Sequence, residues 1–143
     1  MNKKEAIKIF EKYMKQNVLK IEDKSKGFDQ IVKIITTREG KYALKVPRER
    51  ILLFREEFAC KKLKGKVPVP EIVFKNRNFL IEKYIEGKDL DEVKLTRKQE
   101  EKIYFEAGKM LRKIHKVKTK GLGFIGFDEK GVDNFIKKNP LWK

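Results

Sequence analysis

The sequence predicts an α+β domain in which a five-stranded antiparallel sheet carries one inserted helix. Three observations support this prediction: segments rich in β-branched residues, segments with apolar residues at helical spacing, and short polar turns between neighbouring strands. The expected order is helix, three strands, helix, two strands and helix. Short turns join strands that run antiparallel, and the inserted helix is then expected on one face of the sheet.

The first half of the chain is expected to form one helix and three strands. Apolar residues recur at helical spacing over residues 3–16, from Ala6 to Met14. The segment "QIVKIITT" is rich in β-branched residues and is typical of a strand. Pro47 should end the third strand because it has no N–H to donate. The expected strands are 18–21, 30–37 and 41–47, with a polar turn at 22–29 and a hairpin turn at Gly40.

The second half begins with a helix over residues 48–64, in which Leu52, Ala59 and Leu63 lie on one side. The connector at 65–71 is held extended by two prolines, and two strands follow at 71–75 and 78–85. A long helix is expected over 97–117. Its start is marked by a capping box of Thr96 and Gln99. The apolar face of this helix comprises Ile103, Ala107, Met110, Leu111 and Ile114, and a further helix is expected to begin within 132–138.

The charge of the chain narrows the classes of partner. Charged residues make up 41 % of the 143 residues, and the net charge is +16. Such a charge attracts polyanions, including nucleic acid. The basic residues are nevertheless spread from Lys3 to Lys143, so we favour a solvated lysine-rich surface over a dedicated nucleic-acid interface. The single cysteine, Cys60, excludes an internal disulfide bond and a cysteine-based metal cluster.

Composition also bears on the cellular setting. A chain rich in Lys and Glu, with one cysteine and one histidine, is typical of proteins from hot environments. The first ten residues lack the apolar segment of a secretory signal, and no apolar run approaches the length of a membrane span. We therefore expect a cytoplasmic protein without a membrane partner.

One carboxylate stands out in the helix at 48–64. The neighbours of Glu56 at three and four positions are Leu52, Leu53, Ala59 and Cys60, all apolar, so Glu56 is expected inside a buried stripe. A carboxylate in such a place needs a cation. Lys45, in the middle of the preceding strand "KYALKVP", is the simplest partner. The alternatives are a glutamate at the edge of the stripe and a lysine that points into water.

Four segments, in this order, resemble the aminoglycoside and choline phosphotransferase branch of the protein-kinase-like fold. "YALKVP" is similar to its lysine strand, and "REEFACKKLKGKVPVPEIV" resembles its glutamate helix and Val-Pro connector. "FLIEKYIEGKDL" resembles its hinge, and "AGKMLRKIHKVK" resembles the first helix of its C-terminal lobe. The resemblance implies a nucleotide-binding N-terminal lobe at 1–86 and the helical start of the C-terminal lobe at 87–143.

The resemblance also implies roles for individual residues. Lys45 would contact the α- and β-phosphates of ATP, and Glu56 would hold Lys45 in place. The turn around Ser25, Lys26 and Gly27 would cover the phosphates, although it has a single glycine where protein kinases have several. The adenine pocket would be formed by the small side chain of Ala43, by Ile81 at its back, and by backbone groups of Glu82 and Tyr84.

The catalytic half of this fold is not apparent in the sequence. Phosphoryl transfer needs a catalytic Asp and Asn and Asp ligands for Mg²⁺. The only histidine, His115, is followed by "KVKTKG", without Asp or Asn, and is interpreted as a packing residue at a helix end. We therefore identify no catalytic or metal-binding residue, and expect weak ATP binding and little Mg²⁺ binding by this chain alone.

The expected function is that of a truncated phosphotransferase, a kinase-like fragment that is inactive alone. Its partners would be a nucleotide and either a second copy of the chain or another chain that supplies the C-terminal lobe. The alternative is a scaffold module or a basic nucleic-acid-binding module, which clustering of Lys and Arg on one face would favour.

Overall fold

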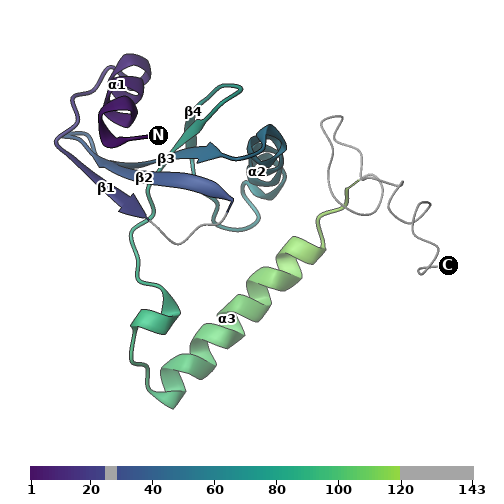
Figure 1. Cartoon of the computed structure of the whole chain (residues 1–143). Coiled ribbons are helices and arrows are strands. Elements are labelled where there is room, and N and C mark those ends of the chain that lie inside the picture. Colours follow the sequence, from purple (N-terminus) through teal and green to yellow (C-terminus); the bar gives the residue numbers. More distant parts are fainter. Residues whose placement is uncertain (25–28, 120–143) are drawn as a thin grey trace. The chain divides into compact units, whose positions relative to one another are not determined.

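The structure is a computed structural model that describes residues 1–24 and 29–119. The elements follow the predicted order (Figure 1). They are α1 (Lys3–Met14), β1 (Lys20–Lys24), β2 (Gln30–Thr36), β3 (Lys41–Pro47), α2 (Arg50–Leu63), β4 (Ile72–Lys75), β5 (Leu80–Lys83), the short 3₁₀ helix η1 (Leu90–Glu92) and α3 (Arg97–His115).

The strands form one sheet in the order β1-β2-β3-β5-β4, and every neighbouring pair is antiparallel. The helix α2 is inserted between β3 and β4, as the sequence predicts. The α+β fold class with a five-stranded antiparallel sheet is therefore confirmed. The hairpin between β2 and β3 closes where Thr37 N–H donates to the Gly40 carbonyl, and the positive φ of Gly40, 144°, explains the glycine.

The core lies between α1 and one face of the sheet (Figure 1). Phe10 of α1 is fully buried, and its ring centroid lies 5.3 Å from that of Tyr42 on β3. The start of α1 is fixed by a capping box between Asn2 and Glu5. The buried members of this core are Ala6, Phe10, Ile35, Tyr42, Leu44, Phe79 and Ile81.

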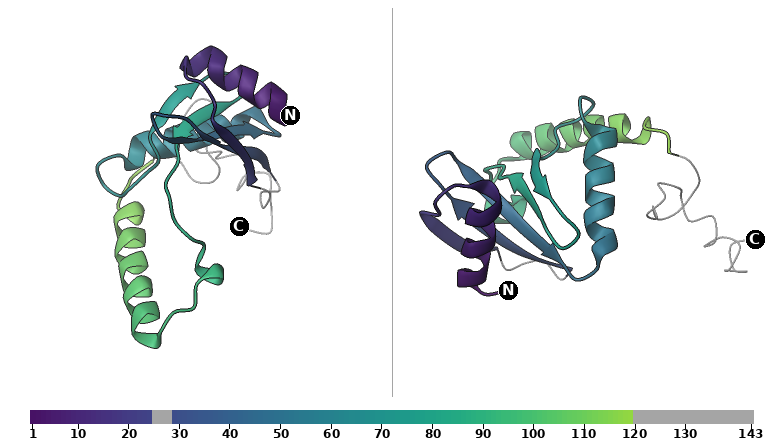
Figure 2. Two further views of the ribbon diagram at one scale, coloured as in Figure 1. Left: turned by 90° about the vertical axis from the view of Figure 1, so that its left-hand side faces the viewer. Right: turned by 90° about the horizontal axis from the view of Figure 1, so that it is seen from above.

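The chain divides into two compact units. The first consists of Met1–Glu57 and Pro70–Ile85, and it contains the whole sheet and α1. The second consists of Phe58–Val69 and the chain from Glu86 onward, and it contains α3. Figure 2 shows α3 as one uninterrupted helix, preceded by an extended connector with η1. Within the described ranges, no helix is both long and apolar enough to cross a membrane.

The first strand differs from the prediction. Residues 22–29 were expected to form a turn, but β1 runs from Lys20 to Lys24 and pairs with β2 along its length. The side chains of β1 are mostly exposed because it lies at the edge of the sheet. The strand is stabilised by backbone hydrogen bonds to β2 and not by buried side chains. Its sequence therefore lacks the alternation of apolar and polar residues by which a strand is recognised.

The buried side of α2 also differs from the prediction. Ala59 was expected on the apolar side of this helix but is exposed, whereas Leu53 and Phe58 are buried. Leu52 and Leu63 are only partly buried. The apolar residues at i, i+7 and i+11 therefore predicted the helix correctly. They predicted the wrong side of it to be buried.

The long helix α3 begins as predicted, with a capping box formed by Thr96 and Gln99. Its expected apolar face is poorly covered: no residue of α3 is buried, and Leu111 and Ile114 are 51 % and 38 % exposed. The helix expected to begin within 132–138 lies outside the described residues.

Candidate functional site

Lys45 of β3 lies on the face of the sheet opposite α1. Successive side chains of a strand point to opposite faces, and its neighbour Leu44 belongs to the core under α1. The Lys45 side chain is 19 % exposed, so most of it is removed from water. The lysine therefore does not simply point into solvent, and a buried ammonium of this kind requires carboxylate partners.

The first partner is Glu56 of α2, as the sequence predicts. Its Oε1 atom lies 2.5 Å from Lys45 Nζ and accepts a hydrogen bond from it. The Glu56 side chain is 19 % exposed, so most of it is removed from water, as the sequence predicts. The next residue of α2, Glu57, forms an ion pair with Lys75 of β4. Two consecutive glutamates thus connect α2 to two strands.

The second partner is the side chain of Glu82 on β5, which the sequence analysis did not identify. Its Oε1 atom lies 2.6 Å from Lys45 Nζ, and its side chain is only 7 % exposed. The sequence contained the necessary signal, because Glu82 follows Phe79, Leu80 and Ile81 in an apolar strand. A carboxylate among apolar residues needs a cation, and Glu82 is in this position as much as Glu56 is.

Burial and charge act against each other in this cluster of Lys45, Glu56 and Glu82. Burial alone would lower the pKa of Lys45, but hydrogen bonds and charges from the two glutamates outweigh it, so the pKa of Lys45 is raised above 10.5. For Glu82, burial raises the pKa, Lys45 opposes the rise, and the nearby Glu56 carboxylate adds to it. The net result is a pKa of Glu82 above its ordinary 4.5.

Two residues predicted for the adenine pocket lie on different faces of the sheet. Ala43 is buried and pairs across strands with Glu82, on the face that carries Lys45. Ile81 pairs with Leu44 and is buried in the core under α1. The expected place of the Ile81 side chain at the back of the pocket is therefore wrong, because strand alternation turns it away. Leu80, the direct register partner of Lys45, occupies the correct face instead.

Tyr84 follows β5 and is partly buried. Its backbone N–H donates to the Lys41 carbonyl at 3.0 Å and is therefore engaged in the sheet. A contact from Tyr84 to an adenine edge would have to use its carbonyl or its ring. The ammonium of Lys24, at the end of β1, lies 5.7 Å from the centre of the Tyr84 ring. Lys24 is a cation on this side of the sheet that the sequence analysis missed.

The remaining predicted residues contribute little to the described site. Ser25, Lys26 and Gly27, expected to cover phosphates, lie outside the described residues. His115 is the last residue of α3 and is exposed, so it does not pack at the helix end as expected. In the described part of the chain, no three His, Cys, Asp or Glu side chains gather as ligands for a metal ion.

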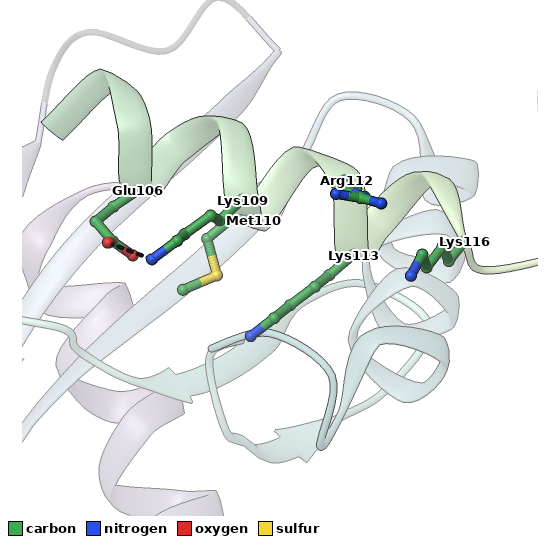
Figure 3. Close-up of a pocket in the computed structure, with 6 residues that line it drawn as sticks. All are labelled: Glu106, Lys109, Met110, Arg112, Lys113 and Lys116. Carbon is green, nitrogen blue, oxygen red and sulfur yellow. Dashed lines mark hydrogen bonds and ion pairs between the residues drawn. The ribbon is translucent and has the colours of Figure 1, made fainter. Parts of the chain in front are cut away.

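A separate depression lies along α3 in the second unit (Figure 3). Its volume is about 610 Å³. Four of its described lining residues are basic, and the only acidic one among them, Glu106, is paired with Lys109 at 2.8 Å. These lining residues are Glu106, Lys109, Met110, Arg112, Lys113 and Lys116. Four basic side chains thus gather at the C-terminal end of α3, although basic residues are dispersed over the chain as a whole.

Comparison with solved structures supports the fold. A ternary complex of streptomycin, ATP and APH(2″)-IIa matches with a TM-score of 0.62 and 24 % identity, over 82 % of this chain and 41 % of that one. The aminoglycoside phosphotransferase APH(4)-Ia, in a complex with ADP and hygromycin B, matches with a TM-score of 0.69 and 16 % identity, over 87 % of this chain and 44 % of that one. The chain thus spans about two fifths of the length of these proteins. At such identities, the likeness shows the protein-kinase-like fold alone.

Comparison with protein families shows which family the chain belongs to. No curated protein matches the chain. The family model of the phosphotransferase enzyme family matches residues 20–137, which include every member of the Lys45 cluster. Because this match covers well over half of the 143 residues, the chain belongs to the phosphotransferase enzyme family.

Proposed function

We propose that this chain is the ATP-binding part of a phosphotransferase, and that Lys45 binds the phosphates. The observation that carries the proposal is the ion pair between Lys45 of β3 and Glu56 of α2. In kinase-like folds, a lysine of this strand and a glutamate of the following helix hold the nucleotide phosphates. Two solved structures of the same fold contain ATP or ADP, which supports nucleotide binding in this chain.

The expected affinity for ATP is low. Two carboxyl groups already bind the ammonium of Lys45, so a phosphate gains less from it than from an unpaired lysine. The described residues also include no group of side chains placed to bind Mg²⁺, so we assign none of them a role in binding the metal. The catalytic Asp, the metal ligands and the acceptor site would come from additional polypeptide, either a second chain or residues beyond those described.

Titration calorimetry with ATP at millimolar concentration tests this function. We expect weak binding to the unmodified chain and at least a tenfold loss in Lys45→Met, which removes the phosphate contact. Lys20→Met is the matched control, because Lys20 pairs with Glu22 at the exposed edge strand. Equal binding by Lys45→Met and the unmodified chain would contradict the assignment of Lys45.

A second assay tests whether phosphate transfer requires additional polypeptide. With labelled ATP, the chain alone should transfer no phosphate to aminoglycosides, choline-like alcohols or sugars. Turnover that disappears in Lys45→Met would show that additional polypeptide is unnecessary. Turnover that survives in Lys45→Met would point to a contaminating kinase.

A polyanion-binding function is the second candidate, and the basic depression on α3 favours it. Four positive side chains along two turns of a helix can each contact a phosphate of a nucleic-acid backbone. RNA binding should then weaken steeply with salt, and the double variant Arg112→Glu/Lys113→Glu should abolish it. Binding that is unchanged in this variant would exclude α3 as the interface.

A further inference from the structure

In the function proposed above, the carboxyl group of Glu82 acts only as a second partner of Lys45. It is more deeply buried than its two partners, with 7 % of the side chain exposed against 19 % for Lys45 and for Glu56. Its Oε1 atom and that of Glu56 meet at the same ammonium, at 2.6 and 2.5 Å. Two buried carboxyl groups are thus held together by a single cation.

The other oxygen of each carboxyl group is also buried. Glu56 Oε2 and Glu82 Oε2 are inaccessible to solvent and have no hydrogen-bond partner in the described part of the chain. A buried acceptor without a donor is destabilising, because it has lost its hydrogen bonds to water. Two such atoms in one cluster require a physical explanation, since native proteins leave few of them.

One additional proton would give the two carboxyl groups a hydrogen bond to each other. A protonated carboxyl group carries an O–H donor, and Glu82 lies within hydrogen-bond reach of Glu56, so a proton on one group can be donated to the other. The charges of the cluster also favour it: one ammonium and two carboxylates sum to −1, whereas a single added proton brings the sum to zero. Carboxyl groups that share a site commonly hold one proton between them in this way.

Among the described residues, Lys45 and Glu56 are the charged groups that act on Glu82. Lys45 faces it from β3 and Glu56 faces it from α2. Its register partners are apolar, Ala43 on β3 and Ile72 on β4, and Ile34 of β2 lies next along the same ladder. Burial and the Glu56 carboxylate, opposed by Lys45, raise the pKa of Glu82.

We propose that Glu82 is a positioning residue of the nucleotide site, which shares one proton with Glu56 and so keeps the cluster around Lys45 neutral. The proposal rests on the proposed function, in which Lys45 binds the phosphates. When Glu82 loses the proton, the cluster becomes negative and repels them. ATP affinity should therefore fall as pH rises, and ATP binding should favour the protonated form of Glu82.

The shared proton can be tested without nucleotide. The full chain is labelled with ¹³C at the glutamate carboxyl carbons, and their chemical shifts are followed with pH. We expect one titration step above the ordinary glutamate pKa of 4.5. The step should be lost or lowered in both Glu56→Gln and Glu82→Gln, since it belongs to the pair, and kept in Glu101→Gln, an exposed control. Ordinary titration of every glutamate would overturn the proposal.

The effect on the nucleotide is tested by ATP affinity between about pH 5 and 9, without Mg²⁺. The affinity of the unmodified chain should fall about tenfold more than that of Glu82→Gln, equal to one pKa unit of coupling. The amide introduced by this substitution would mimic the protonated carboxyl group, because its carbonyl can accept from Lys45 and its NH₂ can donate to Glu56. The pH dependence of ATP itself is common to both proteins and cancels.

The outcomes are distinguishable. Parallel curves for the unmodified chain and Glu82→Gln would overturn the positioning role, and Glu101→Gln must follow the unmodified chain. If neither protein binds ATP at any pH, the proposed function fails and the positioning role fails with it. The carboxyl titration still decides, in that case, whether Glu56 and Glu82 share a proton.

Discussion

Within the described residues, Lys45 is the one cation that ion-pairs with the buried carboxyl groups of both Glu56 and Glu82. Its contribution to stability is best judged from the two buried carboxyl groups that would lack a cation if Lys45 were removed. A buried pair adds little when compared with apolar residues of the same size, but a carboxylate deprived of its cation is costly. The arrangement is therefore consistent with selection for function at Lys45, because an apolar cluster could provide the same packing.

We predict that Lys45→Met lowers the free energy of unfolding by about 2 kcal/mol or more at neutral pH, since two buried carboxyl groups lose their cation. Urea denaturation measures the change. The triple variant Lys45→Met/Glu56→Gln/Glu82→Gln should recover much of the loss, because its side chains carry no charge. A single variant as stable as the unmodified chain would mean that water reaches the cluster freely.

Glu82 should make stability depend on pH. Its pKa in the folded chain lies above the ordinary value of 4.5, so between these two values the folded state retains a proton that the unfolded chain releases. Raising the pH through this window lowers the free energy of unfolding. Glu82→Gln should therefore gain stability relative to the unmodified chain as pH rises above about 4.5 and keep this gain at neutral pH.

Chemical denaturation across this pH range provides the measurement. It must stay below the raised pKa of Lys45, because the stability that Lys45 contributes is present below its ordinary value of 10.5 and is lost as pH rises through the raised value. A constant difference between Glu82→Gln and the unmodified chain at all pH values would show that Glu82 titrates normally.

At the scale of the elements, α2 shows which features of the fold the sequence could predict and which it could not. The order of the elements, the hairpin at Gly40 and the start of α3 were all predictable, because local propensity and turn chemistry decide them. The orientation of α2 was not, because it depends on which side chains the sheet accepts. Leu53 is 2 % exposed, while Ala59, equally apolar in sequence, faces solvent.

The site was partly predictable for the same reason. Glu56 could be paired with Lys45 because a buried charge restricts its own partners. Ile81 was misplaced because the hinge was interpreted as a continuous motif, whereas a strand alternates its side chains between two faces. Leu80 is the register partner of Lys45, so the alternation of side chains along β5 places Glu82 on the same face as Lys45 and Ile81 on the opposite face.

The orientation of α2 yields a direct test. Leu53→Ala should lower the free energy of unfolding by about 2–4 kcal/mol, because it leaves a cavity at a buried position. Ala59→Glu should change it by about 0.5 kcal/mol or less, because the side chain extends into solvent. Thermal or urea denaturation of the two variants compares them. If Ala59→Glu proved the more damaging, the stripe that the sequence predicted would be the buried one.

At the scale of the whole molecule, the two units differ in how well they cover their apolar side chains. The first unit has a closed core around Phe10, Leu44 and Ile81, all fully buried. In the second unit, no residue of α3 is buried, and Tyr104 and Phe105 are 71 % and 65 % exposed. Large exposed apolar patches usually mark an interface or a risk of aggregation. We therefore expect a partner polypeptide to bind the apolar side chains of α3.

We predict that the chain associates through α3, with itself or with a partner, and that Leu111→Glu/Ile114→Glu reduces this association at least tenfold. A buried carboxylate without a cation opposes an apolar interface, whereas on an exposed helix two added charges cost little. Light scattering over a range of concentrations measures the mass, and circular dichroism checks that α3 stays folded. Lys98→Gln/Lys102→Gln, on the same helix, changes the net charge by the same two units and controls for the effect of charge. A strictly monomeric chain, with hydrogen exchange as slow in α3 as in the sheet, would show that α3 is covered by the chain itself.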